Sequence, residues 1–205
     1  MKYNWKERLI VMTKVLIVGS GFTANEVNDY DYKNNGWTIV AVNNGWMACA
    51  NYFDYHMYPN DYTRDRKVVP NYLPHQKYFV YTQDDLRPYG GQGACGQSAT
   101  LNIGYAVLRR LKPRVIGFLG CDMNYTPRED GATAIYGVGH DIATRGISDP
   151  DSMVKRFGKD DPNYLHDIYT RFSNVAKEHN CDVYNFSSDE NTRLPYPKAS
   201  PEDFR

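Results

Sequence analysis

The fold is decided by the stretch Lys14-Val15-Leu16-Ile17-Val18-Gly19-Ser20-Gly21-Phe22-Thr23, in which an apolar run leads into a Gly-Ser-Gly turn. The next residues, 24–29, are compatible with a helix, so the stretch predicts a buried strand, a tight turn and a helix N-terminus. Glycines at 19 and 21 would let the backbone approach a bound group closely, because neither carries a Cβ. Free N–H groups at a helix start favour an anion, which predicts a phosphate or diphosphate ligand. An ordinary strand-to-helix turn is the alternative, because the third glycine of the dinucleotide fingerprint is missing.

The rest of the chain alternates between apolar strand-like runs and helix-like segments. This alternation predicts a Rossmann-like α/β domain over residues 13–205, with a parallel sheet and helices on both faces. Residues 1–12 are interpreted as an N-terminal extension, and the Gly/Pro/Asp/Arg-rich segment at 125–161 as a lid. Further strands are predicted at 36–42, 52–56, 77–81, 114–120 and 182–186, and helices at 46–51, 97–111 and 163–179, with a helix start at 200–204.

Polar residues follow several of the predicted strands. They are the Gly-Ser-Gly turn, Asn43-Asn44, Asp54 and the segment Cys121-Asp122-Met123-Asn124. In parallel sheets the carboxyl ends of the strands meet at one edge, and ligands bind there. The sequence therefore predicts that these residues converge on one ligand site.

Composition restricts the classes of function. The formal net charge of zero gives no overall field for nucleic acid or an anionic membrane. The four cysteines form no Cys-x-x-Cys pair, so they are predicted to be buried free thiols of a cytoplasmic protein. No apolar run is long enough for a membrane span, and the N-terminus is too polar for a signal peptide. No spacing of His, Cys, Asp or Glu suggests a zinc site.

Five histidines are candidates for acid–base chemistry. His166 begins the helix that follows the predicted lid, and a histidine there could act as a general base. The alternative for His166 is an exposed helix residue without a role. His140, inside the predicted lid, is the second choice, and His56 could contact the ligand. His75 and His179 are expected at the surface.

Several of these motifs occur in the order seen in a known family. They are Val18-Gly19-Ser20-Gly21-Phe22-Thr23, Ala41-Val42-Asn43-Asn44, the loop and helix start at 93–100, Phe118-Leu119-Gly120-Cys121-Asp122 and Tyr164-Leu165-His166. From residue 13 onward the chain resembles the family 42 bacterial sialyltransferases. It also resembles the wider Rossmann group that contains the 6-hydroxymethylpterin diphosphokinase-like proteins, including in its tail at 194–204. The resemblance implies a GT-A-like variant of the fold.

The resemblance also implies roles for individual residues. The first turn would hold the nucleotide phosphate, the residues at 43, 96–98 and 122 would contact the donor, and His166 would deprotonate the acceptor hydroxyl. The family has a tyrosine two residues after its aspartate, where this chain has Asn124, so Tyr125 or Tyr136 would assist the departing phosphate. With the residues placed by strand position, the predicted nucleotide-sugar site comprises Gly19, Ser20, Gly21, Thr23, Asn43, Asn44, Asp54, Gly96, Gln97, Ser98, Asp122, Asn124, Tyr125 and Tyr136.

The resulting prediction is a nucleotide-sugar-dependent glycosyltransferase with no required metal or other cofactor. Its partners would be the nucleotide-sugar donor and an acceptor that is a glycan, a small molecule or a modified nucleobase of viral DNA. A homo-oligomer is compatible with the sequence. The first alternative is a Mg²⁺-dependent diphosphokinase-like enzyme with Asp54 and Asp122 near the phosphates. The second is a non-catalytic nucleotide-binding protein.

Overall fold

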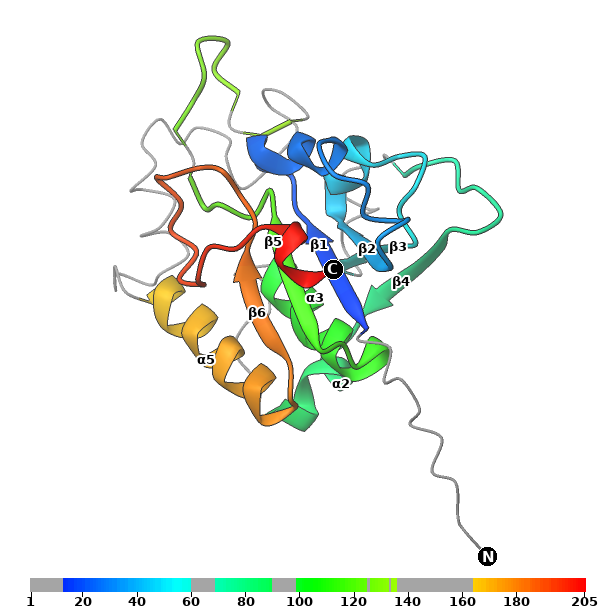
Figure 1. Cartoon of the computed structure of the whole chain (residues 1–205), viewed down its shortest axis with the longest axis vertical. Helices are drawn as coiled ribbons and strands as arrows, with labels where there is room; N and C mark the ends of the chain where they lie inside the picture. Colours follow the sequence, from blue (N-terminus) through cyan, green and yellow to red (C-terminus); the bar gives the residue numbers. More distant parts are fainter. Residues whose placement is uncertain (1–12, 60–68, 90–98, 125, 133, 136–163) are drawn as a thin grey trace, which may run out of the picture.

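The chain forms an α/β fold around a six-stranded sheet in which every pair of neighbouring strands is parallel (Figure 1). The computed structural model describes residues 13–59, 69–89, 99–124, 126–132, 134–135 and 164–205. The strands are β1 (Lys14–Val18), β2 (Trp37–Val42), β3 (Tyr55–Pro59), β4 (Lys77–Tyr81), β5 (Val115–Leu119) and β6 (Asp182–Asn185). The α-helices are α2 (Gln83–Leu86), α3 (Ala99–Leu111) and α5 (Tyr164–Glu178). Four 3-10 helices are η1 (Phe22–Asn28), η2 (Asn43–Ala48), η3 (Arg87–Tyr89) and η4 (Pro201–Phe204).

Strand β1 lies in the middle of the sheet, whose order is β4-β3-β2-β1-β5-β6. It pairs with β2 on one side and β5 on the other, so that Val18 lies opposite both Ala41 and Leu119. All five β1 residues are buried, which explains their continuous apolar run. The chain builds outward from β1 to β4, then crosses to β5 and builds in the opposite direction. The boundary between β1 and β5 is therefore the topological switch point, as the Rossmann-like prediction requires.

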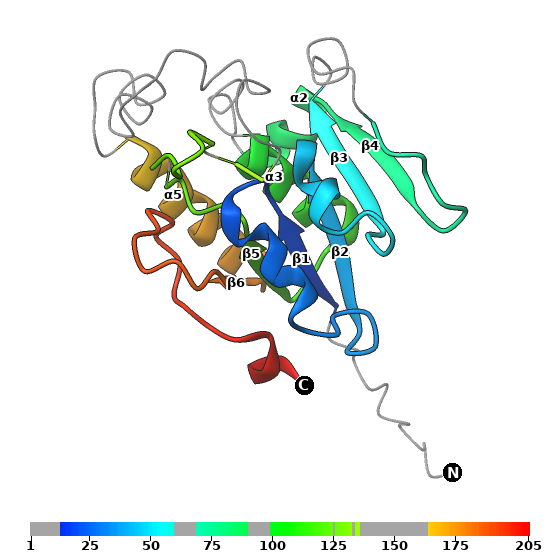
Figure 2. The same cartoon turned by 90° about the horizontal axis from the view of Figure 1, so that it is seen from above.

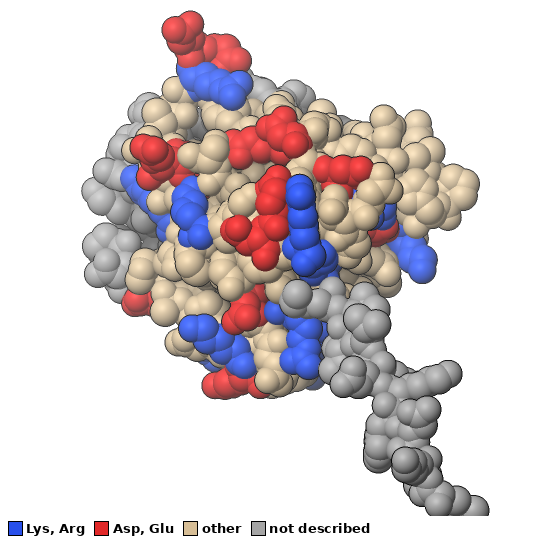
Figure 3. All heavy atoms as spheres, in the orientation of Figure 1, with Lys and Arg blue, Asp and Glu red and all other residues tan. Residues whose placement is uncertain are grey.

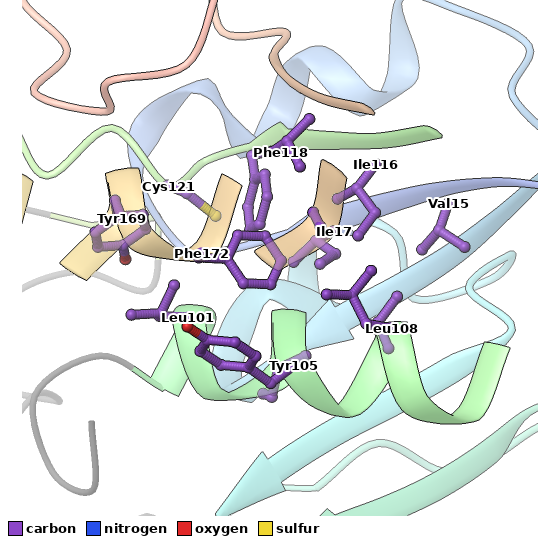
Figure 4. Close-up of a cluster of buried hydrophobic side chains, with 14 of the residues drawn as sticks. Val15, Ile17, Leu101, Tyr105, Leu108, Ile116, Phe118, Cys121, Tyr169 and Phe172 are labelled. Atoms are coloured by element: carbon purple, nitrogen blue, oxygen red, sulfur yellow. The ribbon is translucent and has the colours of Figure 1, made fainter. Parts of the chain in front are cut away.

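Two apolar clusters cover the two faces of the sheet. Figure 2 shows α3 and α5 on one side of the sheet and the C-terminal segment on the other. Val15 and Ile17 of β1 belong to the cluster that α3 and α5 cover, where Leu101, Tyr105 and Phe172 pack (Figure 4). Leu16 and Val18 point to the other face, because side chains alternate along a strand. That face packs against residues of η1, η2 and the C-terminal segment.

The helical segments expected at 24–29 and 46–51 are present, but each begins two or three residues earlier. The chain forms the 3-10 helices η1 and η2 there, seven and six residues long. Such short segments gain little from α-helical propagation, and the asparagines in both favour local bonds over a regular helix. Helices thus cover both faces, as predicted, but only one face carries long α-helices.

After β6 the chain returns across the sheet (Figure 1), and its end lies beside the start of β1. The Lys14 ammonium donates to the carbonyl oxygen of Phe204 at 2.7 Å. The Phe204 ring meets Trp37 and Phe186 at centroid distances of 6.0 and 5.8 Å. Ser200 caps η4 in a capping box, which confirms the helix start predicted at 200–204.

The bounds of the other helices and strands agree with the prediction to different degrees. The long helices and the strands at 77–81, 114–120 and 182–186 are confirmed to within a few residues. The strand predicted at 52–56 instead begins at Tyr55 and runs to Pro59, into the segment expected to be irregular. The short helices α2 and η3 were not predicted. Within the described ranges, no helix is both long and apolar enough to cross a lipid bilayer.

Candidate functional site at the carboxyl edge of the sheet

Three segments meet beyond the carboxyl ends of the central strands. They are the glycine turn after β1, the start of η2 after β2 and the loop after β5. Their contact is close: a Cβ added to Gly45 would lie 2.3 Å from the carbonyl oxygen of Val18. The convergence expected from the sequence is present for these three segments.

The glycines of the first turn are needed by the neighbouring loop. The N–H groups of Gly19 and Gly21 donate to the carbonyl oxygens of Leu119 and Gly120, both at 2.8 Å. A Cβ at position 19 would lie 2.3 Å from the Gly120 oxygen, and one at position 21 would lie 2.9 Å from it. Packing against the β5 loop therefore explains both glycines without a ligand, and it stands beside the prediction that they make room for phosphate.

Part of the turn still presents donors. The N–H groups of Ser20, Phe22 and Thr23 meet no acceptor among the residues that the structure describes. The Ser20 carbonyl oxygen accepts from the N–H of Ile135 at 3.0 Å, so the segment after β5 lies against this turn. The Arg128 guanidinium from the same segment lies 3.7 Å from the centre of the Phe22 ring. Peptide and guanidinium donors are thus present beside the turn, although η1 is too short to add a strong dipole.

Asp122 and Thr23 join the β5 loop to the glycine turn. The Thr23 hydroxyl donates to Oδ2 of Asp122 at 2.6 Å and accepts from the N–H of Gly120 at 3.1 Å. Burial raises the pKa of the Asp122 carboxyl, while the hydroxyls of Ser187 and Thr23 favour its charged form. Its other oxygen, Oδ1, is buried and has no hydrogen-bond partner within the described part of the chain.

A segment near the C-terminus covers the β5 loop. The carbonyl oxygen of Asp122 accepts from the Arg193 N–H at 2.9 Å and from the Thr192 hydroxyl at 3.2 Å. The side-chain amide of Asn124 donates to Asp189 at 2.8 Å. Asn124 is therefore engaged with the loop at 187–193, a contact that the sequence analysis missed because no local pattern signals it.

Asn43 occupies an unusual backbone conformation at the end of β2. Its φ is +48°, and its side-chain oxygen Oδ1 is buried with no partner among the described residues. Its carbonyl oxygen lies 2.8 Å from Nε2 of His56, whose Nδ1 lies 2.8 Å from the Tyr72 hydroxyl. Asn44 is also buried, at the same edge. The structure therefore brings both predicted asparagines to the carboxyl edge.

His56 is not available to a ligand, which corrects the expectation of a direct contact. Its side chain is fully buried on β3, and burial lowers its pKa to about 4 although the bond to Asn43 opposes this. A carbonyl oxygen can only accept, so Nε2 must carry the proton and Nδ1 must accept from Tyr72. His56 is a neutral imidazole in a fixed tautomer.

Asp54 lies at the wrong end of its strand for the predicted site. It precedes β3, and its Oδ2 accepts from the N–H of Ile39 at 2.8 Å. Its other oxygen forms an ion pair with Lys33. The prediction placed Asp54 at a carboxyl end because it assumed a strand three residues too early. The carboxylate instead joins β2 and β3 near the amino end of β3.

His166 lies in the first turn of α5, and its side chain is 61% exposed, with Nδ1 at 3.7 Å from Oδ1 of Asp167. The helix ends beside the start of β6, and its 15 residues span about 22 Å. Its first turn is therefore at the carboxyl edge of the sheet (Figure 1). His75 and His179 are exposed, as predicted.

Several predicted site residues lie outside the described ranges. These are Gly96, Gln97, Ser98, Tyr125, Tyr136 and His140, together with most of the predicted lid at 125–161. Cys49, Cys121 and Cys181 are buried free thiols, as predicted.

Neither the charge on the viewed face (Figure 3) nor the metal-binding side chains of the described residues mark a site. Figure 3 shows acidic and basic side chains intermixed on the viewed face, in keeping with the formal net charge of zero. No three His, Cys, Asp or Glu side chains among the described residues are grouped so as to hold a metal ion. Comparisons of the chain with protein-family models, with curated proteins and with solved structures each give no match.

Proposed function

We propose that this chain is a nucleotide-sugar-dependent glycosyltransferase whose donor binds at the carboxyl edge, beside the switch point between β1 and β5. The observation that carries the proposal is a pair of buried oxygens without partners among the described residues. Oδ1 of Asn43 follows β2 and Oδ1 of Asp122 follows β5, the two strands that flank β1. Buried acceptors without donors are costly, so a ligand with hydroxyl or N–H groups would be stabilised there. Ribose, a nucleobase and a sugar all provide such groups.

The donor diphosphate would lie on the other side of the glycine turn. The N–H groups of Ser20, Phe22 and Thr23 are available to it, and Arg128 is close to the Phe22 ring. Asp122 is unsuitable as a phosphate neighbour, because two further carboxylates, Asp189 and Glu26, add negative charge near it and raise its pKa. A phosphate there would meet like charge, whereas the Arg128 side offers charge-assisted hydrogen bonds.

The chemical step in this proposal belongs to His166. Its exposed imidazole would take the proton of the acceptor hydroxyl while the bond between sugar and phosphate breaks. The resemblance supplies the remaining roles: Gly96, Gln97 and Ser98 on the nucleotide, and Tyr125 or Tyr136 on the departing phosphate. The GT-A-like variant of the fold and the lid at 125–161 belong to the same proposal. The acceptor is a glycan, a small molecule or a modified nucleobase.

The diphosphokinase-like alternative is less favoured, because its two candidate carboxylates lie far apart. Asp54 precedes β3 and Asp122 follows β5, with β2 and β1 between these strands. Three strand spacings separate them by about 14 Å across the sheet alone. One Mg²⁺ cannot be held by both carboxylates, since its ligands lie at ~2.1 Å.

A thermal-stability screen of nucleotides and nucleotide sugars tests the proposal. At a ligand concentration of roughly 100 times Kd, the free energy of unfolding rises by about 2.7 kcal/mol, and Tm rises by several degrees. The stabilising nucleotide sugar is then incubated with acceptors in excess EDTA. We expect turnover to persist, because protein donors stabilise the departing phosphate.

Three other outcomes of the screen and the EDTA assay would each contradict a part of the proposal. If no nucleotide or nucleotide sugar raises Tm, the site is misassigned. Activity that EDTA abolishes and Mg²⁺ restores would favour a metal-dependent phosphoryl-transfer enzyme with other ligands. Binding without consumption of any donor would favour the non-catalytic nucleotide-binding protein.

A further inference from the structure

We propose that His56 and Tyr72 form a positioning relay for Asn43, which keeps the Asn43 amide oxygen turned to the ligand site. The inference rests on the proposed function for the identity of the ligand. It assigns the relay a ligand group of one kind, a hydroxyl or N–H donor of the nucleotide sugar. His56 itself would touch no substrate.

The relay is a directed chain of hydrogen bonds. Nε2–H of His56 donates to the Asn43 carbonyl oxygen, and the Tyr72 hydroxyl donates to Nδ1, both at 2.8 Å. His56 is fully buried, and Phe53 and Tyr58 lie against its ring at centroid distances of 6.1 and 4.8 Å. Its imidazole therefore has little freedom, and it fixes the backbone of Asn43.

The backbone at Asn43 needs such support. Four described non-glycine residues have positive φ: Asn43, Lys112, Met123 and Asn180. Lys112 and Asn180 come just after α3 and α5, where left-handed residues commonly end helices. Asn43 instead begins η2 directly after β2, so no helix C-terminus explains its φ of +48°. A left-handed residue costs of order 1 kcal/mol or more, and such strain persists where surrounding contacts hold it.

The conformation has one consequence at the site. The Asn43 carbonyl is turned back toward β3, where His56 binds it, while Oδ1 stays buried without a partner among the described residues. The relay uses the backbone of Asn43 and leaves its amide oxygen for something else. An acceptor of this kind selects a ligand hydroxyl or amino group and rejects a bare phosphate oxygen.

The positioning role can be tested without ligand. In His56→Leu the ring donor is lost, and we expect the ¹³C shifts of the Asn43 Cα and carbonyl to leave the left-handed range. In His56→Gln, an amide N–H can replace Nε2–H, so the shifts should stay near those of the wild type. Val107→Ala is the matched control, because it removes buried apolar volume on α3 away from the relay. Tyr72→Phe is a milder second variant if His56→Leu does not fold.

The ligand role is tested by a double-mutant cycle on affinity for the nucleotide or nucleotide sugar that stabilises the wild type. We expect His56→Leu to weaken binding about tenfold, with little effect from His56→Gln or Val107→Ala. In the Asn43→Gly background, His56→Leu should have no further effect, because the positioned amide is already absent. Independent, multiplying effects would overturn the relay, as would unchanged Asn43 shifts in His56→Leu. If the wild type binds no nucleotide, the proposed function fails, while the chemical shifts still decide whether His56 positions Asn43.

Discussion

Gly19 is explained either by packing against the β5 loop or by room for a ligand. The two explanations make opposite predictions for the stability of Gly19→Ala, which adds a single methyl group. A Cβ there would lie 2.3 Å from the Gly120 oxygen and 2.7 Å from the Cys121 sulfur. Gly19→Ala should therefore lower the free energy of unfolding by roughly 2–4 kcal/mol with no ligand present, since overpacking forces backbone shifts. Urea unfolding measures this change. Ser20→Ala, in the same turn, should stay within about 0.5 kcal/mol of the wild type.

The opposite result would favour the first interpretation of the turn. A Gly19→Ala protein as stable as the wild type but unable to bind nucleotide would show that the glycine makes room for ligand. The sequence could not distinguish these cases, because both require a glycine after a buried strand. The distinction depends on Gly120 and Cys121, which lie a hundred residues away in the sequence.

At the scale of elements, continuous apolar runs were the most reliable signal. The segments of β1 and β5 are buried along their whole length, so their composition alone marks them as central strands. β3 was placed too early because Tyr52 and Phe53 extend the aromatic run before Asp54. Its true start is fixed by pairing, with Tyr55 opposite Val40. Register between distant strands leaves little trace in a single stretch of sequence.

The orientation of α5 yields the prediction for its first histidine. His166 lies at the carboxyl edge and His179 follows the other end of the same helix, so the two exposed histidines form a matched pair. His166→Ala should reduce turnover about a hundredfold or more, the usual contribution of a positioned base. Nucleotide affinity should barely change. His179→Ala should leave turnover and affinity near those of the wild type.

Steady-state kinetics and calorimetry on the two variants measure these effects. If His140→Ala abolishes turnover while His166→Ala does not, the base lies in the segment at 125–161. Loss of turnover in His179→Ala would contradict the placement of the site at the carboxyl edge.

At the scale of the whole molecule, parallel topology made part of the site predictable. Asn43 and Asp122 follow strands that flank β1, so their convergence follows from strand order alone. Strand order did not predict the relay from Tyr72 or the covering loop at 187–193, because each joins segments that are distant along the chain. These contacts exist only once the sheet has assembled. Individually, the residues have no sequence signature.

The same assembly makes the stability of the whole fold depend on pH through His56. Its pKa is lowered from 6.5 to about 4 in the folded state, because its fully buried ring cannot be charged cheaply. The unfolded chain therefore binds more protons between these values, and the free energy of unfolding must rise with pH across that window. The contribution is fully present above about pH 6.5 and lost below about pH 4, and it amounts to roughly 3 kcal/mol.

Urea unfolding at several pH values between about 4 and 7 measures this dependence directly. Carboxyl groups also contribute to the pH dependence at the lower end of this range. The pH dependence of the wild type must therefore be compared with that of His56→Gln, which keeps an N–H for Asn43 but cannot be protonated. The slope attributable to His56 should disappear in that variant, while the slope from the carboxyl groups remains. Equal slopes in both proteins would mean that the imidazole is charged or hydrated in the native state. The relay that holds Asn43 would then lack the neutral tautomer on which it depends.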